Sequence, residues 1–316
     1  MRRGNSYIRG AVLLLCALGF TLSSFQPSQA AIKKAQVAPK KEVLAAPGQK
    51  VVAIIDTGID PRTTAISKNI ISEACISHNA SCPNGTNFMA GPGAATLPLA
   101  AMANGTFEHG TEVASATIIA NANVKILEVR CSSIVETSKW EGCTYDDIAT
   151  SMQWLLDNRV QLNLGAVVLP MATTPSKSCD VDEKNQKIVA QFISNEIPVI
   201  ASSGNNAVYD AVSNPGCIPG VLAISCVDSS GALAAYANYS ARVDFAAKGD
   251  FTVIAKSNKK IFAQGTSLAA GAFGGQWVAL AAEKKLSMKD QLAWITSHST
   301  TAVAPVAGES VPVFNY

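Results

Sequence analysis

Three short segments of the chain carry polar side chains in unusual company. Asp56 ends the apolar run in "VVAIIDTGID", His109 opens the small-residue segment "HGTEVASA", and Ser267 lies within "GTSLAAGAFGG". The glycines of the last segment would each cost a helix about 1 kcal/mol relative to alanine, so something other than helix propensity accounts for them. A carboxylate, an imidazole and a hydroxyl are together the parts of an activated nucleophile, which indicates acyl transfer.

Simpler roles are open for each of these residues taken singly. Asp56 could cap a turn, and His109 could be a packing residue at the start of a helix. Two other histidines have ordinary explanations: His78 lies in a polar loop, and His298 follows a helical segment, where a cation favours the helix dipole. The case for chemistry therefore rests on the three segments together.

Two other hydrolase classes fit the pattern poorly. An aspartic protease also places Asp-Thr-Gly after an apolar strand, but it needs two such loops, and only Asp56 heads one here. An α/β-hydrolase would place its serine in Gly-x-Ser-x-Gly and ahead of its acid and histidine. Ser267 is followed by Leu-Ala and comes last in the chain.

The elements that must position these residues follow from hydrophobic patterning. Five short apolar runs read as buried strands, at residues 50–56, 123–130, 165–170, 197–202 and 220–225. Between them, 144–158 and 182–195 show helical periodicity, and Ser287 with Asp290 resembles a capping box for a helix near the C-terminus. Alternating strands and helices predict an α/β fold with a mostly parallel central sheet and helices on both faces. Ligands of such sheets gather at the carboxyl ends of the strands, where Asp56 stands.

The N-terminus predicts export. Three arginines precede an apolar run from Ala11 to Leu22, and a small-x-small cleavage site ends at Ala30. The alternative, an uncleaved membrane anchor, requires about 20 apolar residues, and this run is shorter. We therefore expect a signal peptide at 1–30, a short basic linker at 31–50, one catalytic domain at 51–316, and a secreted or periplasmic protein without stable membrane association.

Composition limits the partners. With 48% hydrophobic and 15% charged residues, the chain can bury a sizeable core. The first fifty residues hold eight Lys or Arg and one Glu, so the rest carries 17 basic and 22 acidic residues. No basic, aromatic-interleaved patch follows the linker, and we expect no nucleic-acid partner.

Cysteine usage agrees with export. Seven cysteines remain after Cys16 is set aside with the signal peptide, and none has the paired spacing with a nearby histidine that zinc requires. Disulfides are the better interpretation, and one thiol must stay unpaired. Cys226 lies in an apolar run, where a free cysteine behaves as a small hydrophobe, and is our candidate.

The three opening segments resemble, in order, the signature segments of subtilisin-like serine proteases (subtilases, peptidase family S8). "PVIASSGNNA" is similar to the family's strand that ends in Gly-Asn, and the stretch from Asn214 to Ser240 resembles the segment that follows it. The resemblance covers the chain from Val51 to its end. It implies a three-layer subtilisin-like fold and a serine endopeptidase that works through an acyl-enzyme intermediate.

The resemblance also assigns roles. Asp56, His109 and Ser267 would form the catalytic triad, and the Asn205 side chain would donate to the oxyanion. The implied substrate-binding residues are Met171, Ala172, Thr173 and Gly204. It implies peptide or protein substrates. We expect a monomer, and we predict no cofactor and no metal ligands. Some extracellular members join cysteines at the positions of Cys179 and Cys217, and we expect that disulfide here together with the local pairs Cys75–Cys82 and Cys131–Cys143.

Several positions depart from the family pattern. Glu112 stands where a second histidine is usual, Gly271 where proline is usual, and Thr173 where glycine is expected, so that its side chain would narrow the primary specificity pocket. None of these is a triad member. They leave open a second hypothesis, a catalytically weak or inactive subtilase-like binding module. The segment 87–105 is rich in Gly, Pro and Ala and is expected to be an irregular loop.

Overall fold

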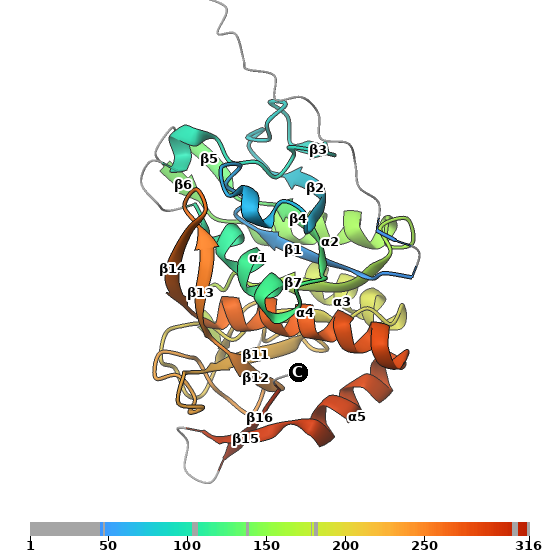
Figure 1. Ribbon diagram of the computed structural model, residues 1–316, viewed down its shortest axis with the longest axis vertical. Coiled ribbons are helices and arrows are strands. Elements are labelled where there is room, and N and C mark those ends of the chain that lie inside the picture. The colour runs from blue at the N-terminus through green and yellow to red at the C-terminus, as the bar shows by residue number, and fades with distance from the viewer. Residues whose placement is uncertain are drawn as a thin grey trace, which may run out of the picture. The chain divides into compact units, whose positions relative to one another are not determined.

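The computed structural model describes residues 45–46, 48–102, 107–136, 139–177, 179, 183–304 and 309–314 (Figure 1). All of them belong to one compact unit, Pro39–Tyr316. The expected signal peptide at 1–30 and most of the expected linker at 31–50 lie outside the described residues, so both stay predictions.

A ten-stranded, mostly parallel sheet forms the centre of this unit. Its strand order is β15-β16-β12-β11-β9-β7-β1-β4-β2-β3. The neighbours from β16 to β2 pair in parallel, and the edge strands β15 and β3 pair antiparallel. The strands are β1 (Val51–Asp56), β2 (Ile70–Ile76), β3 (Phe88–Ala90), β4 (Lys125–Arg130), β7 (Leu164–Leu169), β9 (Val199–Ser202), β11 (Leu222–Val227), β12 (Phe245–Lys248), β15 (Thr300–Val303) and β16 (Ser310–Val313).

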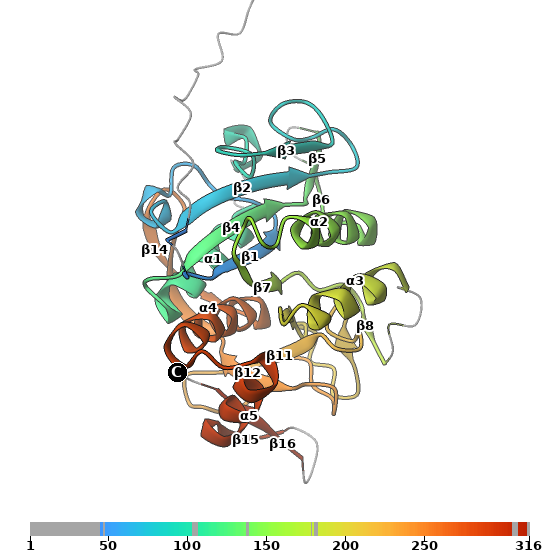
Figure 2. The same cartoon turned by 90° about the vertical axis from the view of Figure 1, so that its right-hand side faces the viewer.

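Helices cover both faces of the sheet, as expected (Figure 2). On one face, α2 (Tyr145–Asp157) and α3 (Glu183–Ser194) pack against one set of strand side chains, which includes Ala53 and Ile55 of β1. On the other, α1 (His109–Ala120) and α4 (Thr266–Lys284) pack against the alternate set, which includes Val52 and Ile54. Every residue of β1 is buried because both faces are covered. Helix α5 (Met288–His298) follows α4, and Ser287 Oγ caps it by accepting from Asp290 N.

The small residues of α4 are explained by its surroundings. A Cβ atom at Gly271 would lie 2.8 Å from both Thr117 Oγ1 and Val113 Cγ1 of α1, and one at Gly274 would lie 2.6 Å from Val168 Cγ2 of β7. Helices α1 and α4 lie side by side on this face of the sheet, and the backbone of α4 is in close contact with both α1 and β7 (Figure 1). Alanine-sized or larger residues would push these elements apart.

Smaller elements that the sequence did not reveal surround the sheet. Two hairpins stand apart from it: β5 (Ser133–Glu136) with β6 (Lys139–Glu141), and β13 (Asp250–Ala255) with β14 (Lys259–Gln264). A third pair is β8 (Pro175–Ser176) with β10 (Val212–Ser213). A 3-10 turn, η1 (Thr64–Ile66), follows β1. Segment 87–105 is not wholly irregular as expected, because it holds β3 and the 3-10 turn η2 (Leu99–Met102).

Three disulfides join the described cysteines. They are Cys75–Cys82, Cys131–Cys143 and Cys179–Cys217, the pairs expected above, and Cys226 is buried and unpaired. Burial raises the pKa of the Cys226 thiol to about 12, so this cysteine is an inert core residue. Within the described part of the chain, every helix is too short or too polar to span a bilayer.

Candidate active site

Asp56 and His109 form a closely coupled pair. Strand β1 ends at Asp56 and α1 begins at His109, and His109 Nδ1 lies 2.8 Å from both carboxylate oxygens of Asp56. Asp56 is fully buried, whereas the His109 side chain is one-third exposed. A carboxylate can only accept, so His109 Nδ1 carries the proton and Nε2 is the free base.

Backbone and hydroxyl contacts fix this pair in place. Thr57 Oγ1 donates to Phe107 O at 3.0 Å and accepts from Gly110 N at 2.9 Å, which ties the turn after β1 to the first turn of α1. On the other side of the turn, Cys131 N donates to Asp56 O at 3.0 Å. The Thr-Gly dipeptide after the aspartate is therefore part of the support of the histidine.

Ser267 is the second residue of α4 and is 7% exposed. Its hydroxyl lines the same cavity as His109, although the hydrogen bond that would join the two is not formed in this structure. Such bonds are often loose without substrate and tighten when it binds. The Ser267 N–H, in the first turn of α4, makes no hydrogen bond to any described residue, so it is one of the unpaired N–H groups that give a helix N-terminus its partial positive charge.

The side chain of Asn205 offers a second N–H group beside Ser267. Its Oδ1 accepts from Thr266 N at 3.0 Å and from Thr266 Oγ1 at 2.9 Å. With Oδ1 held in this way, the Nδ2 amide group is left to donate, and Asn205 lines the cavity with Ser267. Asn205 Nδ2 and Ser267 N are therefore two N–H groups on residues of one cavity, and groups of this kind are the donors that an oxyanion site uses.

The cavity has a volume of about 470 Å³ and brings most of the predicted site residues together. Three of the four residues predicted to bind substrate line it. Gly204 does not: it is buried with φ +104°, and a Cβ atom there would lie 2.3 Å from Asn238 Nδ2, so its part is conformational. The lining residues are Thr57, His109, Gly142, Cys143, Ile148, Pro170, Met171, Ala172, Thr173, Asn205, Asn206 and Ser267.

Thr173 lines this cavity, and its side chain is hydrogen-bonded to its surroundings. Its hydroxyl lies 3.3 Å from Asn214 O, to which it donates, and 3.2 Å from the Tyr145 hydroxyl. Its backbone N–H also donates to Asn214 O, at 3.0 Å. These bonds connect the strand-end segment at 170–173 to the start of α2 and to the loop after β10.

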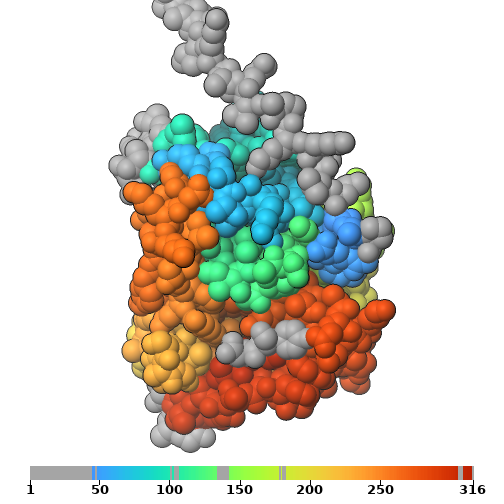
Figure 3. All heavy atoms as spheres, viewed as in Figure 1, coloured from blue at the N-terminus to red at the C-terminus, as the bar shows by residue number. Residues whose placement is uncertain are grey.

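A carboxylate network that the sequence did not reveal holds the start of α1. Asp60, fully buried, accepts from Arg62 at 2.8 and 2.9 Å and from Ser257 N at 3.2 Å, and Glu108 Oε2 accepts from Lys256 N at 3.0 Å. The tip of the β13–β14 hairpin is thus bound to the residue that precedes His109. In Figure 3 the orange atoms of this hairpin lie against light-blue atoms of the segment after β1. No local motif marks the two contacts with the hairpin, because they join residues that are 148 and 197 positions apart.

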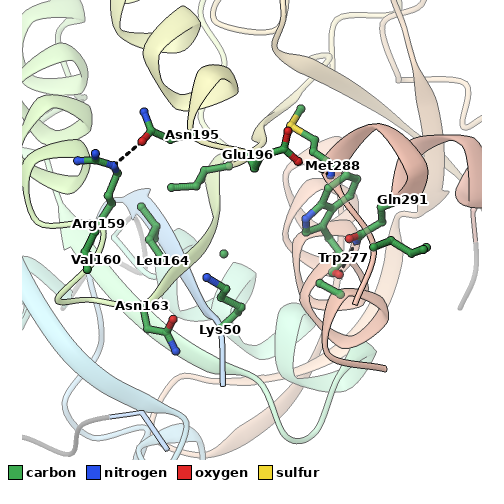
Figure 4. Close-up of a pocket in the computed structure, with 14 residues that line it drawn as sticks. Lys50, Arg159, Val160, Asn163, Leu164, Asn195, Glu196, Trp277, Met288 and Gln291 are labelled. Atoms are coloured by element: carbon green, nitrogen blue, oxygen red, sulfur yellow. Dashed lines mark hydrogen bonds between the residues drawn. The ribbon is translucent and has the colours of Figure 1, made fainter. Parts of the chain in front are cut away.

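A second cavity, of about 410 Å³, lies at the amino ends of the parallel strands, on the side of the sheet away from the catalytic residues (Figure 4). Lys50 precedes β1 and Leu164 opens β7, so this is the edge where the strands begin. Two hydrogen bonds cross its walls, Arg159 to Asn195 and Gln291 to the Trp277 carbonyl. None of the predicted site residues lines it.

Comparison with known proteins agrees with the geometry. The model of the subtilase family, Peptidase S8, matches residues 48–310. The chain belongs to the subtilase family. Membership makes it a serine-type endopeptidase with peptide substrates, and the parallel α/β fold is the subtilisin-like one. A search of curated protein sequences found no match.

Solved structures share the fold of this subtilase at low sequence identity. A protease from Pseudoalteromonas arctica PAMC 21717 matches with a TM-score of 0.67 at 22% identity, over 85% of this chain and 89% of that one. A lanthipeptide protease matches with a TM-score of 0.64 at 15% identity, over 85% and 86%. A cold-adapted subtilisin-like serine proteinase matches with a TM-score of 0.60 at 18% identity, over 87% and 92%.

The Glu112 carboxylate sets this subtilase apart electrostatically. Burial lowers the pKa of His109, but the charge and hydrogen bond of Asp56, joined by the charge of Glu112, outweigh it, so the pKa of His109 is raised. Burial also raises the pKa of Glu112 itself, against the opposing charges of His109 and Lys256. A glutamate at this position therefore favours the protonated imidazole.

Proposed function

We propose that this subtilase is a secreted serine endopeptidase that cleaves peptide bonds through Asp56, His109 and Ser267. The observation that carries the proposal is the bifurcated contact of His109 Nδ1 with both carboxylate oxygens of Asp56, beside the cavity that His109 and Ser267 line. That contact fixes the tautomer whose Nε2 can take a proton from a serine hydroxyl.

The reaction then follows in two halves. His109 Nε2 takes the Ser267 hydroxyl proton as the oxygen attacks the scissile carbonyl, and Asp56 stabilises the imidazolium. Asn205 Nδ2 and the Ser267 N–H donate to the oxyanion as it forms. The imidazolium next protonates the leaving amine, which releases one product and leaves an acyl-enzyme. A water molecule, deprotonated by the same Nε2, hydrolyses the ester and frees Ser267.

The cavity supports a preference for uncharged side chains. His109 is the only titratable group among the described side chains that line it, and the walls include Ile148, Met171 and Ala172. Thr173 lines the cavity where glycine is usual in the family, and this larger side chain favours small substrate side chains beside it. Three disulfides within the described residues support export to an oxidising compartment, either outside the cell or in a periplasm. We expect the enzyme to act as a monomer, without a cofactor.

The rival hypothesis is a weak or inactive subtilase-like binding module. Glu112 favours it, because the charge of Glu112 raises the pKa of His109 and so reduces the fraction of free base at a given pH. That effect lowers activity at acidic pH and does not remove the base. Peptide hydrolysis at a pH above the pKa of His109 distinguishes the two hypotheses, because an active enzyme must cleave peptides there and a binding module must not.

The test is peptide hydrolysis by purified protein and three single variants. Ser267→Ala, His109→Ala and Asp56→Asn should each lose most of kcat, by about 10⁴- to 10⁶-fold, the range measured for subtilisin itself. The triple variant should be barely worse than Ser267→Ala, because the three groups act as a unit. His78→Ala is the matched control.

That control removes a histidine of similar surroundings. His78 Nδ1 lies 2.8 Å from Asp147 Oδ2, as His109 lies from Asp56, but His78 does not line the cavity. We expect near-normal turnover in His78→Ala. Near-normal turnover in His109→Ala instead would end the proposal, and a folded wild-type protein without turnover at any pH would favour the binding module.

A further inference from the structure

Glu128, in the middle of β4, is a buried carboxyl group without a partner. It is fully buried, and neither Oε1 nor Oε2 has a hydrogen-bond partner among the described residues. A buried carboxylate left in this way costs several kcal/mol of desolvation, and groups of this kind need a specific reason to persist. Glu128 takes no part in the mechanism above.

Its position relates it to the catalytic pair. Glu128 pairs with Ile54, two residues before Asp56, and both carboxyl groups are on the face of the sheet that α1 covers. A Cβ atom at Gly110, the residue after His109, would lie 2.7 Å from Glu128 Oε1 and 2.6 Å from Gly58 O. The Glu128 carboxyl group therefore fills the space between the turn after Asp56 and the first turn of α1.

Arg130 fills the neighbouring space without neutralising Glu128. A Cβ atom at Gly58 would lie 3.1 Å from Arg130 Cδ, so this side chain passes beneath the same turn. Its nitrogen atoms donate to three backbone carbonyls, those of Ser132, Thr96 and Ser81. The described residues include no ion pair between Arg130 and Glu128. The Arg130 guanidinium therefore binds backbone carbonyls and does not pair with the Glu128 carboxyl group.

The other charged groups around Glu128 oppose its ionisation. Asp56 lies on β1 and Glu73 pairs with Glu128 from β2. Helix α1 contributes His109, which is already paired with Asp56, and Glu112, which is partly exposed. Burial raises the pKa of Glu128 well above its usual range, and the charges of Asp56 and Glu73 raise it further. A neutral carboxylic acid carries a proton that it can donate, whereas a carboxylate can only accept. Gly58 O is a backbone carbonyl in the same region, since it and Oε1 would lie 2.6 and 2.7 Å from a Cβ atom at Gly110.

We propose that Glu128 is a positioning residue for the catalytic pair: as a buried, neutral carboxylic acid it holds the Asp56 turn against the start of α1 without adding a second negative charge beside Asp56. The positioning role rests on the proposed triad, whereas the neutral state does not. The two parts can therefore be tested separately.

The neutral state is tested by the pH dependence of stability. A glutamate that stays protonated when folded costs stability as pH rises above about 4.3, where the unfolded chain ionises, by up to tenfold in the folding equilibrium per pH unit. Glu128→Gln removes this cost. The thermal midpoint of Glu128→Gln minus that of its parent should therefore increase steadily from pH 4 to pH 8. Both proteins carry Ser267→Ala, which prevents self-digestion.

The matched control is Glu73→Gln on the neighbouring strand. Glu73 is partly exposed, and its Oε2 accepts a hydrogen bond from Ala95 N at 3.1 Å, so this carboxyl group, unlike that of Glu128, has a partner. This variant should show no such gain. A Glu128→Gln midpoint that falls relative to the wild type as pH rises, or that keeps a constant difference, would overturn the neutral state.

The positioning role is tested by kinetics in the active background. Glu128→Ala should lower kcat by about tenfold or more with a smaller change in KM, because the Asp56 turn and α1 lose their support. Glu128→Gln should restore most of that kcat, and its kcat/KM should decline less than that of the wild type at alkaline pH. Wild-type kcat in folded Glu128→Ala would overturn the role. If the wild type itself is inactive, the proposed function fails while the stability result still stands.

Discussion

Replacing Asn205 with alanine tests the oxyanion site. The change removes Nδ2, one of two donors, while Ser267 N remains. One such donor is worth about 3 to 4 kcal/mol, or 10²- to 10³-fold in kcat, the range measured for subtilisin. Because the bond strengthens only in the transition state, KM should change little. Steady-state hydrolysis of a chromogenic peptide measures both constants.

Thr266 offers a sharper version of the same test. Its backbone and hydroxyl hold Asn205 Oδ1 at 3.0 and 2.9 Å, so Thr266→Val should cost about 1 kcal/mol of barrier by loosening the donor. The double variant Thr266→Val/Asn205→Ala should lose no more kcat than Asn205→Ala alone, since Thr266 acts through Asn205. Losses that simply add, or an Asn205→Ala effect confined to KM, would refute the assignment.

Three further predictions follow from single contacts. Glu112→Gln should move the acid limb of the kcat/KM profile to lower pH, because the Glu112 charge raises the pKa of His109 and thereby keeps the imidazole protonated to higher pH; an unmoved limb would contradict this. Replacing Cys179 and Cys217 together with serine opens a 38-residue loop and should cost roughly 3 to 4 kcal/mol in denaturant unfolding, and the loss should vanish when both proteins are reduced. Gly271→Val should cost about 1 to 3 kcal/mol by pressing on α1, and an unchanged midpoint would show that the two helices can separate freely.

The centre of the fold could be predicted because buried parallel strands are uninterrupted apolar runs. The five expected strands are β1, β4, β7, β9 and β11, which lie in the interior of the sheet. The outer strands were missed for the converse reason. Strand β2 carries Ser72 and Glu73 within its apolar run, and β16 is a four-residue strand that contains Pro312.

The β13–β14 hairpin shows why local signals are not enough. Its turn residues Lys256, Ser257 and Asn258 all have positive φ, a conformation for which the sequence offers no glycine. Tertiary contacts stabilise it instead: Asn258 Nδ2 donates to Arg62 O at 3.2 Å, and Glu108 and Asp60 accept from the turn. The residues next to this turn in the sequence therefore do not predict it.

The candidate site divides in the same way. Asp56, His109 and Ser267 were predictable because each stands at an element end in a distinctive small-residue context. Gly204 was also predicted to bind substrate; it is buried with positive φ and is not among the residues that line the cavity. Glu128 gave no signal at all, because a single glutamate in a strand does not reveal whether its oxygens find partners.

Labelling with a fluorophosphonate probe tests the central claim most directly, because the probe reacts only with an activated serine hydroxyl. Intact-mass and peptide mass spectrometry of the folded protein at pH 8 should show one probe per chain, bound at Ser267. The His109→Ala variant should label far more slowly, and His78→Ala should label like the wild type. A folded wild-type protein that stays unlabelled at Ser267 would contradict the account and identify the chain as a subtilase-like binding module.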